Sequence, residues 1–280
     1  MKLIKRFVDA VKNKGFSAAL NAVLSYIRYR FGDEYKINQR RKNISAEVSR
    51  MFCAAIAYGA FKGLKFPSEN WWGMTDRASM ILGLYEKEVL ESLVTVPKKY
   101  STFIDLGAAD GYYAVGVLVG NIFERSYCFE MSEQSRSILG KNAELNGVSG
   151  RISIHGVADR EFYKIIPVDR LAASVLLVDI EGAEFELFDA DLFRSFKDSV
   201  IFIELHDWLF DDAQNKLVKL RADAAEFFDI TELTTASRDL SKIPELKKFS
   251  DTDRWLICSE GRAKQMFWYR LDPKTAASIV

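Results

Sequence analysis

The chain has 280 residues, of which 49% are hydrophobic and 28% are charged. This apolar content excludes a disordered chain, and the length suffices for one large domain with an appendage. The formal net charge is zero, which argues against a general nucleic-acid binder. The charge is nevertheless segregated: residues 1–65 hold 14 basic and 4 acidic residues, whereas residues 66–280 hold 25 and 35. The two regions therefore have net charges of +10 and −10.

The three cysteines, Cys53, Cys128 and Cys258, are far apart in sequence and form no CxxC pair. This spacing indicates neither a disulfide framework nor a structural zinc site, and free thiols are typical of a reducing compartment. The longest apolar stretch of the basic region, residues 52–61, is roughly half the length of a transmembrane span. The first residues mix Lys and Arg with apolar residues, which is not a secretory signal. We therefore expect a cytoplasmic protein.

The first 70 residues are predicted to form a basic helical N-terminal region. Apolar residues recur at helical spacing over residues 3–11 and 16–27, and a third helix is expected over about 44–61. Two interpretations remain open. The helices could cap the main domain, or the basic face of residues 1–65 could bind anionic lipid or an anionic glycan carrier at the inner face of the membrane.

Residues 71–280 have the pattern of an α/β domain. After a helix over about 79–93, short apolar runs alternate with helical stretches. Strands are predicted over 101–106, 127–130, 152–156, 175–180, 200–205, 228–233 and 254–258, with helices over 111–119, 133–146 and about 184–196. Such alternation predicts a mostly parallel sheet that is covered by helices on both faces.

The most informative stretch follows the first strand. Asp105 ends the strand, and a turn with Gly107, Ala108 and Gly111 then opens a helix. The dinucleotide fingerprint G-x-G-x-x-G requires glycine where Ala109 stands, and a carboxylate at this point would repel a diphosphate. A carboxylate suits a ligand with a cationic or amine-bearing end, such as S-adenosylmethionine.

Glu130 is predicted to end the second strand, 19 residues after Gly111. A carboxylate at this position in a strand–turn–helix–strand unit can accept hydrogen bonds from both hydroxyls of a ribose. The alternative is that Asp110 caps a helix and Glu130 lies on the surface of an unrelated α/β fold.

Five segments resemble the FkbM family of S-adenosylmethionine-dependent methyltransferases. They are GLYEKEV (83–89), FIDLGAADGYYAVG (103–116), YCFEMS (127–132), LLVDIEGAEFELF (176–188) and IFIELHD (201–207). The resemblance covers about residues 80–235, and residues 178–184 are its most specific part. It implies the class I methyltransferase fold: a Rossmann-like, seven-stranded, mostly parallel sheet with a reversed last strand, to which this chain adds an N-terminal helical extension.

The resemblance also implies how each part of the cofactor is bound. Asp105 and Gly107 would line its methionine end, Glu130 would hold the ribose and Asp159 would contact the adenine amine. Asp110 stands where the family often has Asn. The full implied set of cofactor-binding residues is Tyr85, Glu86, Asp105, Gly107, Ala108, Asp110, Gly111, Glu130, Asp159 and Asp179. Tyr85 and Glu86 would close over the cofactor; alternatively, they are ordinary residues of an amphipathic helix.

A catalytic cluster is expected where the fourth and fifth strands end. Parallel strands would bring Asp179, Glu181, Glu204 and His206 to one mouth of the sheet. We expect His206 to act as the general base, with Asp179 or Glu204 orienting it or binding acceptor hydroxyls. Alternatively, His206 binds substrate without taking a proton. His155, within the third strand, is expected to have a structural role.

The same four residues could also bind Mg²⁺, which would lower the pKa of an acceptor hydroxyl. Acidic residues after strands are common for structural reasons, so a reaction without metal is favoured. If an ion is bound, its expected ligands are Asp179, Glu181, Glu204 and His206.

Two further groups of residues have open interpretations. Trp71, Trp72, Trp208 and residues 266–270 could form a platform for a sugar ring or could be core residues. The charged residues at 253–255 and 260–262 could bind an anionic acceptor or pair internally.

The sequence thus predicts an S-adenosylmethionine-dependent methyltransferase. By the resemblance, it would methylate a sugar hydroxyl in a surface glycan or glycolipid during polysaccharide biosynthesis. N-methylation of an amino sugar or small amine is one alternative, and a catalytically silent scaffold is another. No nucleic-acid partner is expected, and the sequence leaves the oligomeric state open.

Overall fold

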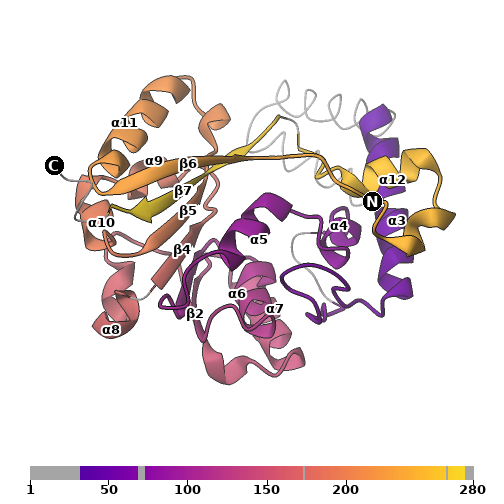
Figure 1. Cartoon of the computed structure of the whole chain (residues 1–280), viewed down its shortest axis with the longest axis horizontal. Coiled ribbons are helices and arrows are strands. Elements are labelled where there is room, and N and C mark those ends of the chain that lie inside the picture. Colours follow the sequence, from indigo (N-terminus) through magenta and orange to yellow (C-terminus); the bar gives the residue numbers. More distant parts are fainter. Residues whose placement is uncertain (1–31, 69–72, 173, 263, 275–280) are drawn as a thin grey trace, which may run out of the picture.

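The computed structural model describes residues 32–68, 73–172, 174–262 and 264–274. These residues form a central sheet with helices on both faces, and further helices extend from one end of it (Figure 1). The helices predicted over residues 3–11 and 16–27, and the Trp71–Trp72 pair, lie outside the described residues.

The described residues contain a seven-stranded sheet of order β3-β2-β1-β4-β5-β7-β6. Its strands are β1 (Thr102–Leu106), β2 (Arg125–Phe129), β3 (Ile152–His155), β4 (Ser174–Val178), β5 (Val200–Glu204), β6 (Phe228–Thr234) and β7 (Phe267–Pro273). Strands β1 to β5 pair in parallel, and β7 is antiparallel to both of its neighbours. This order with a reversed last strand is that of the class I methyltransferase fold, so the predicted fold is confirmed.

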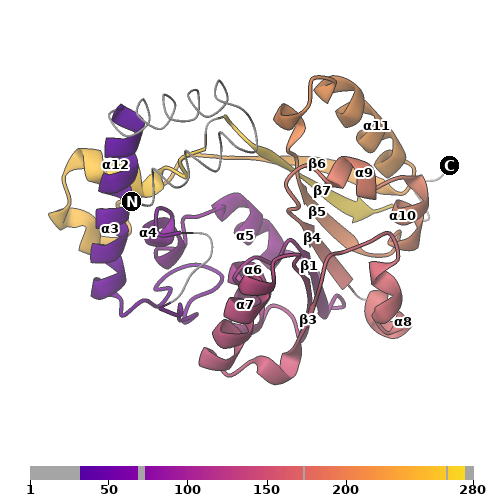
Figure 2. The same ribbon diagram turned by 180° about the vertical axis from the view of Figure 1, so that it is seen from behind.

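Helices cover both faces of this sheet (Figure 2). One face packs against α5 (Lys87–Val94), α6 (Tyr112–Val119) and α7 (Glu133–Leu145). The other packs against α9 (Glu184–Leu187), α10 (Ala190–Ser195) and α11 (Ala213–Ala225). The remaining helices are α3 (Asp33–Met51), α4 (Arg77–Ile81), α8 (Val168–Leu171) and α12 (Asp251–Cys258).

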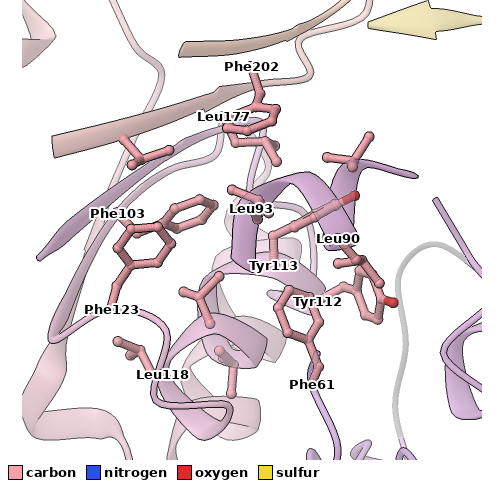
Figure 3. Packing of buried hydrophobic residues seen from close by; sticks show 14 of the residues in the cluster. Phe61, Leu90, Leu93, Phe103, Tyr112, Tyr113, Leu118, Phe123, Leu177 and Phe202 are labelled. Carbon is pink, nitrogen blue, oxygen red and sulfur yellow. The ribbon is translucent and has the colours of Figure 1, made fainter. Parts of the chain in front are cut away.

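The side chains of the central strands alternate between two hydrophobic cores. Phe103, Leu177 and Phe202 face α5 and α6, as Figure 3 shows, whereas Ile104 and Leu176 face the opposite helices. Because both faces are buried, these strands consist mainly of apolar residues, which is why the sequence shows them as short apolar runs.

The third predicted helix has different limits from those expected. It runs over residues 33–51 as α3 rather than 44–61, because Cys53 and Ala54 adopt positive φ and turn the chain away. The apolar residues beyond this turn pack against the sheet domain instead. Phe61 lies against α6 so closely that a Cβ at Gly116 would be 2.4 Å from its ring.

The predicted strand at 254–258 is wrong, because these residues belong to helix α12. Ser250 caps the helix by accepting a hydrogen bond from the Asp253 backbone N–H at 3.2 Å, and Ile257 is buried against α3 and α4. The last strand is instead β7, at residues 267–273. A short apolar run does not distinguish a strand from a buried helical turn, and here tertiary packing selected the helix.

Two other predicted helices are interrupted. The helix expected over 79–93 is split into α4 and α5, because Gly83 has φ +65° and lies so close to Tyr58 that a Cβ would be 2.4 Å from its carbonyl oxygen. The helix expected near 184–196 is split into α9 and α10. Asp189 begins the second of these by accepting a hydrogen bond from the Leu192 N–H at 3.0 Å.

Helix α3 is joined to residues from both sides of the predicted boundary at residue 70. Its buried Ile44 and Val48 share a hydrophobic cluster with α4 and with the segment that leads into α12. Arg40 binds Asp253 through its Nε at 2.7 Å, and Arg41 pairs with Asp76. Part of the basic charge of residues 1–65 is thus neutralised by the acidic remainder of the chain. Within the described ranges, no helix has the length and hydropathy needed to cross a bilayer.

Candidate functional site

A cavity of about 780 Å³ opens where strands β1 to β4 end, the edge at which open α/β sheets bind ligands. We call it the strand-end cavity. Nine of the ten predicted cofactor residues line it: Tyr85, Glu86, Asp105, Gly107, Ala108, Asp110, Glu130, Asp159 and Asp179. Gly111, the tenth, begins helix α6. The sequence therefore located the cavity, although the wall also contains residues that it did not indicate.

The two glycines of the first turn both have a left-handed backbone conformation. Gly107 has φ +89°, and a Cβ there would lie 1.7 Å from the carbonyl oxygen of Asp179. Gly111 has φ +90°, and a Cβ there would lie 3.0 Å from Leu139. Ala109, between them, also adopts a positive φ of 44°. Such strain occurs where the surroundings impose it, often at binding sites.

Asp105 is a buried carboxyl group in the wall of the cavity. Its residue is only 1% exposed, and its Oδ2 atom has no hydrogen-bond partner among the described residues. Burial, followed by the negative charge of Glu130, raises the pKa of Asp105 to about 8. A ligand that donates a hydrogen bond or carries a positive charge would satisfy this oxygen.

Glu130 and Asp159 are held by backbone N–H groups further along the cavity. Glu130 accepts from the Ala109 N–H at 3.0 Å and from the Ser132 N–H at 2.7 Å. Asp159 accepts from the Glu161 N–H at 2.8 Å. Each oxygen can accept a second hydrogen bond, so both carboxylates are fixed in place and can still bind a ligand hydroxyl or amine.

Glu86 lies at the start of α5 with a left-handed backbone, at φ 45°. One of its oxygens accepts from the hydroxyl of Tyr113, and the other pairs with Arg262. Burial, followed by the charge of Glu204, raises the pKa of Glu86 to about 8. Tyr85 precedes it and packs edge-on against Tyr112, with ring centroids 5.6 Å apart.

Arg262 links three carboxylates beside the cavity. It pairs with Glu86 and Glu204, and its Nε lies 3.0 Å from an oxygen of Glu260. Glu260 also binds Arg238 at 3.0 Å. The charges at 260–262 therefore pair internally. Glu204, predicted to be catalytic, lies in this network and does not line the cavity.

His206 is 3% exposed and is held by Glu184. Its backbone N–H donates to Glu184 Oε1 at 2.9 Å, and its ring Nδ1 lies 3.2 Å from the same oxygen. Glu184 also accepts from the Gly182 N–H at 2.8 Å. The sequence indicated Asp179 or Glu204 as the group that orients His206. Glu184 lies in the block 178–184, but an acidic residue at a helix start is common, so the sequence alone does not mark it as a functional residue.

The other ring nitrogen of His206 faces two carboxylates of the cavity wall. Nε2 lies 3.6 Å from Asp179 Oδ1 and 3.6 Å from Glu181 Oε2. Asp179 and Glu181 line the cavity, and His206 lies directly behind them. Glu181 adopts a strained φ of 54°, which turns the chain at this point. Asp179, Glu181 and His206, three of the four residues of the predicted catalytic cluster, thus lie together at one side of the cavity.

The charges around His206 determine its protonation. Burial lowers the pKa of His206, but the hydrogen bond and charge of Glu184, with the charges of Glu204 and Glu181, outweigh burial and raise it. Burial and the charge of Glu204 raise the pKa of Asp179. With Nδ1–H donated to Glu184, Nε2 is the nitrogen that can accept a proton.

Asp179, Glu181 and His206 also have the geometry of a metal site. Each offers one ligand atom, and these atoms lie within 4.8 Å of one another. Glu204, the fourth expected ligand, is not in this group, and its carboxylate pairs with Arg262. These three groups could hold a divalent cation, with the remaining ligands supplied by water or substrate.

The other described residues that the sequence indicated do not line the cavity. His155 stacks on Phe129 with ring centroids 5.2 Å apart, and burial lowers its pKa. Trp268 and Tyr269 are buried core residues of β7. Trp208 is exposed and donates to the sulfur of Met266 at 3.1 Å.

No known family profile matches the chain, and no curated protein matches it. Solved structures do. TrmK of M. capricolum bound to S-adenosyl-homocysteine is 11% identical over 66% of this chain and 67% of its own, with a TM-score of 0.43. A domain of a putative precorrin-6Y C5,15-methyltransferase from Corynebacterium diphtheriae is 18% identical over 69% and 99%, with a TM-score of 0.42. The ribosomal protein L11 methylase of Lactobacillus delbrueckii is 16% identical over 68% and 78%, with a TM-score of 0.41. None of these comparisons points to the FkbM family in particular.

Proposed function

We propose that this protein is an S-adenosylmethionine-dependent methyltransferase. The observation that carries the proposal is the arrangement of acidic groups along the strand-end cavity. Asp105 has an unsatisfied oxygen beside the glycine turn, Glu130 directly follows the second strand and Asp159 follows the third. These positions match, in order, the amino-acid end, the ribose and the adenine of the cofactor.

The charge and shape of the cavity support this assignment. Carboxylates line it from end to end, which favours a ligand with a sulfonium and an ammonium group over a polyphosphate. Phe129, Met131 and Val157 lie at the end near Asp159, where they offer apolar surface to a flat ring. The volume of about 780 Å³ is within the usual range for small-molecule sites.

The groups at the β4 and β5 ends support transfer to a hydroxyl. S-adenosylmethionine, when bound, supplies an electrophilic methyl group. Asp179 and Glu181 can accept hydrogen bonds from the acceptor and hold its reacting oxygen in line with that methyl. Nε2 of His206 would take the proton that the acceptor hydroxyl loses when it receives the methyl group, and Glu184 would stabilise the resulting imidazolium.

A sugar hydroxyl in a surface glycan or glycolipid is the acceptor we propose. Its basis is the FkbM resemblance of residues 80–235, together with the pair of carboxylates that could bind neighbouring hydroxyls. The basic residues of 1–65 would dock the enzyme on an anionic membrane or carrier. The comparisons include tRNA and ribosomal-protein methylases, but the acidic cavity argues against a nucleic-acid acceptor here.

The proposal is tested by methyl transfer from tritiated S-adenosylmethionine to glycan and lipid extracts of the source cell. Label in the saccharide fraction is expected, and Asp105→Asn should abolish it. If methyl groups were transferred only to tRNA or only to protein, the proposal of a sugar acceptor would be wrong. Binding of S-adenosylhomocysteine without any transfer would favour a silent scaffold.

N-methylation is the second candidate. A neutral amine is a stronger nucleophile than a neutral hydroxyl, so it needs little help from a base. His206→Ala should therefore reduce transfer to a hydroxyl strongly and transfer to an amine only slightly.

A further inference from the structure

Arg77 is a buried cation in the wall of the strand-end cavity that neither the sequence nor the proposed chemistry explains. The residue is 4% exposed, and its Nη1 atom has no hydrogen-bond partner in the part of the chain that the structure describes. Its guanidinium stacks on Phe66, with the central carbon 3.7 Å from the ring centroid. Burying a charged donor without a partner is costly, so such a group indicates a missing anion.

The position of Arg77 is fixed by the fold. It is the first residue of α4, and the next N–H, that of Ala78, donates to the hydroxyl of Ser45 at 3.1 Å. Phe66 supports one face of the guanidinium. Burial lowers the pKa of Arg77, and the nearby charge of Asp110 opposes that effect. The side chain therefore remains a guanidinium cation, held in place before any ligand arrives.

The same cavity thus contains two unsatisfied buried groups of opposite charge. Asp105 Oδ2 lacks a donor, and Arg77 Nη1 lacks an acceptor. Residues 107–110, which follow Asp105, also line the cavity, and the charge of Asp110 acts on Arg77. An α-amino acid group carries both an ammonium and a carboxylate, so such a ligand offers a group of the right charge to each of the two side chains.

We propose that Arg77 binds the α-carboxylate of the cofactor, while Asp105 accepts a hydrogen bond from its α-ammonium. This inference rests on the proposed function. A planar guanidinium suits a carboxylate because it can donate two parallel hydrogen bonds. Arg77 is then a binding residue for the amino-acid end, and its stacking on Phe66 holds the guanidinium in position.

The test compares two ligands that share an adenosine portion. S-adenosylhomocysteine carries the amino-acid end, whereas 5′-methylthioadenosine lacks it. Dissociation constants of both are measured by isothermal titration calorimetry with the full chain and with Arg77→Gln. We expect Arg77→Gln to raise the dissociation constant of S-adenosylhomocysteine at least tenfold and to change that of 5′-methylthioadenosine less than twofold.

Arg160→Gln is the matched control. Arg160 also lines the cavity but already pairs with Asp189. Its substitution should therefore not weaken the binding of S-adenosylhomocysteine relative to that of 5′-methylthioadenosine. Arg77→Lys, which keeps the charge but loses the planar fork, should have an intermediate effect and serves if the glutamine variant does not fold. Thermal melting checks the fold of each variant.

Three outcomes would overturn the inference. Equal weakening of both ligands would make Arg77 a structural residue. Unchanged S-adenosylhomocysteine binding with a raised KM for the acceptor would assign Arg77 to an anionic group of that substrate. If the unchanged protein binds neither ligand, the proposed function itself fails, and this result is distinct from the other two.

Discussion

His206 and Glu184 are joined twice, because the backbone N–H and the ring Nδ1 of His206 both contact one carboxylate oxygen of Glu184, at 2.9 and 3.2 Å. The two residues are 22 positions apart, at the start of α9 and just after β5. The double contact fixes the tautomer and the orientation of the imidazole, so that Nε2 faces Asp179 and Glu181.

Glu184→Gln should shift the pH dependence of methyl transfer. A base must be unprotonated, so turnover should rise with pH through the pKa of His206, which its surroundings raise above the usual 6.5. The variant removes the largest charge that raises this pKa, so the midpoint should move to lower pH. His206→Ala should remove the pH-dependent step and lower kcat by roughly 10²- to 10⁴-fold.

Glu186→Gln is the control for this measurement. Glu186 belongs to the same short helix and lines the cavity, but it is exposed and does not contact His206. Its pH–rate profile should match that of the unchanged protein. An unshifted midpoint in Glu184→Gln would show that His206 does not take the proton.

Sequence reasoning predicted the positions of residues that lie at the ends of strands. In a parallel sheet, residues that end successive strands meet at one edge, so Asp105, Glu130 and Asp179 could be placed together without any knowledge of side-chain contacts. The same argument predicted that His206, which follows the fifth strand, lies at this edge of the sheet. It also placed Glu204 at this edge, but the partner of Glu204, Arg262, is 58 residues away and has no local signal.

The features that sequence reasoning missed depend on long-range contacts. Arg77 became a candidate only because packing buries it without a partner for Nη1. Helix α12 appeared as a strand because a four-residue apolar run, 255–258, fits either structure until α3 packs against it. Glu184 could not be identified because acidic residues are common at the start of a helix, and its contact with His206 spans 22 residues.

Asp105→Asn should stabilise the ligand-free protein while preventing cofactor binding. The pKa of Asp105 is raised to about 8, so the folded state favours the protonated carboxyl. The contribution of this protonated carboxyl to the stability of the fold is fully present below about pH 4, the pKa of aspartate in the unfolded chain. It is lost as the pH rises towards 8. Asparagine cannot ionise, so the variant should melt higher than the unchanged protein, most clearly at pH 8.

Melting curves at pH 5, 7 and 8 test this prediction. The stability difference should grow with pH and reach a few kcal/mol at pH 8. Calorimetry should show that S-adenosylhomocysteine no longer binds the variant measurably. A difference independent of pH would mean that Asp105 is already ionised in the folded protein.

Removal of divalent cations should leave turnover unchanged. Asp179, Glu181 and His206 could ligate an ion, but Mg²⁺ prefers oxygen ligands, and our mechanism uses Nε2 of His206 as the proton acceptor. Activity is measured after dialysis against EDTA and again after Mg²⁺ or Mn²⁺ is added. If activity is lost on dialysis and returns when either ion is added, the general-base mechanism is wrong. A metal ion that lowers the pKa of the acceptor hydroxyl would then take its place.

The two glycines of the first turn should differ in how much stability they contribute. Gly107→Ala would place its Cβ 1.7 Å from the carbonyl oxygen of Asp179, so β1 and β4 would have to separate at their ends. Gly111→Ala would meet the side chains of Leu139, at 3.0 Å, and Val115, at 3.1 Å, which can move more easily than a backbone carbonyl. Both positions have positive φ, so alanine is strained at each.

We expect Gly107→Ala to lower the free energy of unfolding by more than about 2 kcal/mol and Gly111→Ala by about 1–2 kcal/mol. Urea denaturation measures both values. Gly107→Ala should also displace Asp179 and therefore lower methyl transfer at temperatures where the variant remains folded. If both variants lost the same stability and Gly107→Ala kept full activity, the close contact between the first turn and Asp179 would not be part of the working site.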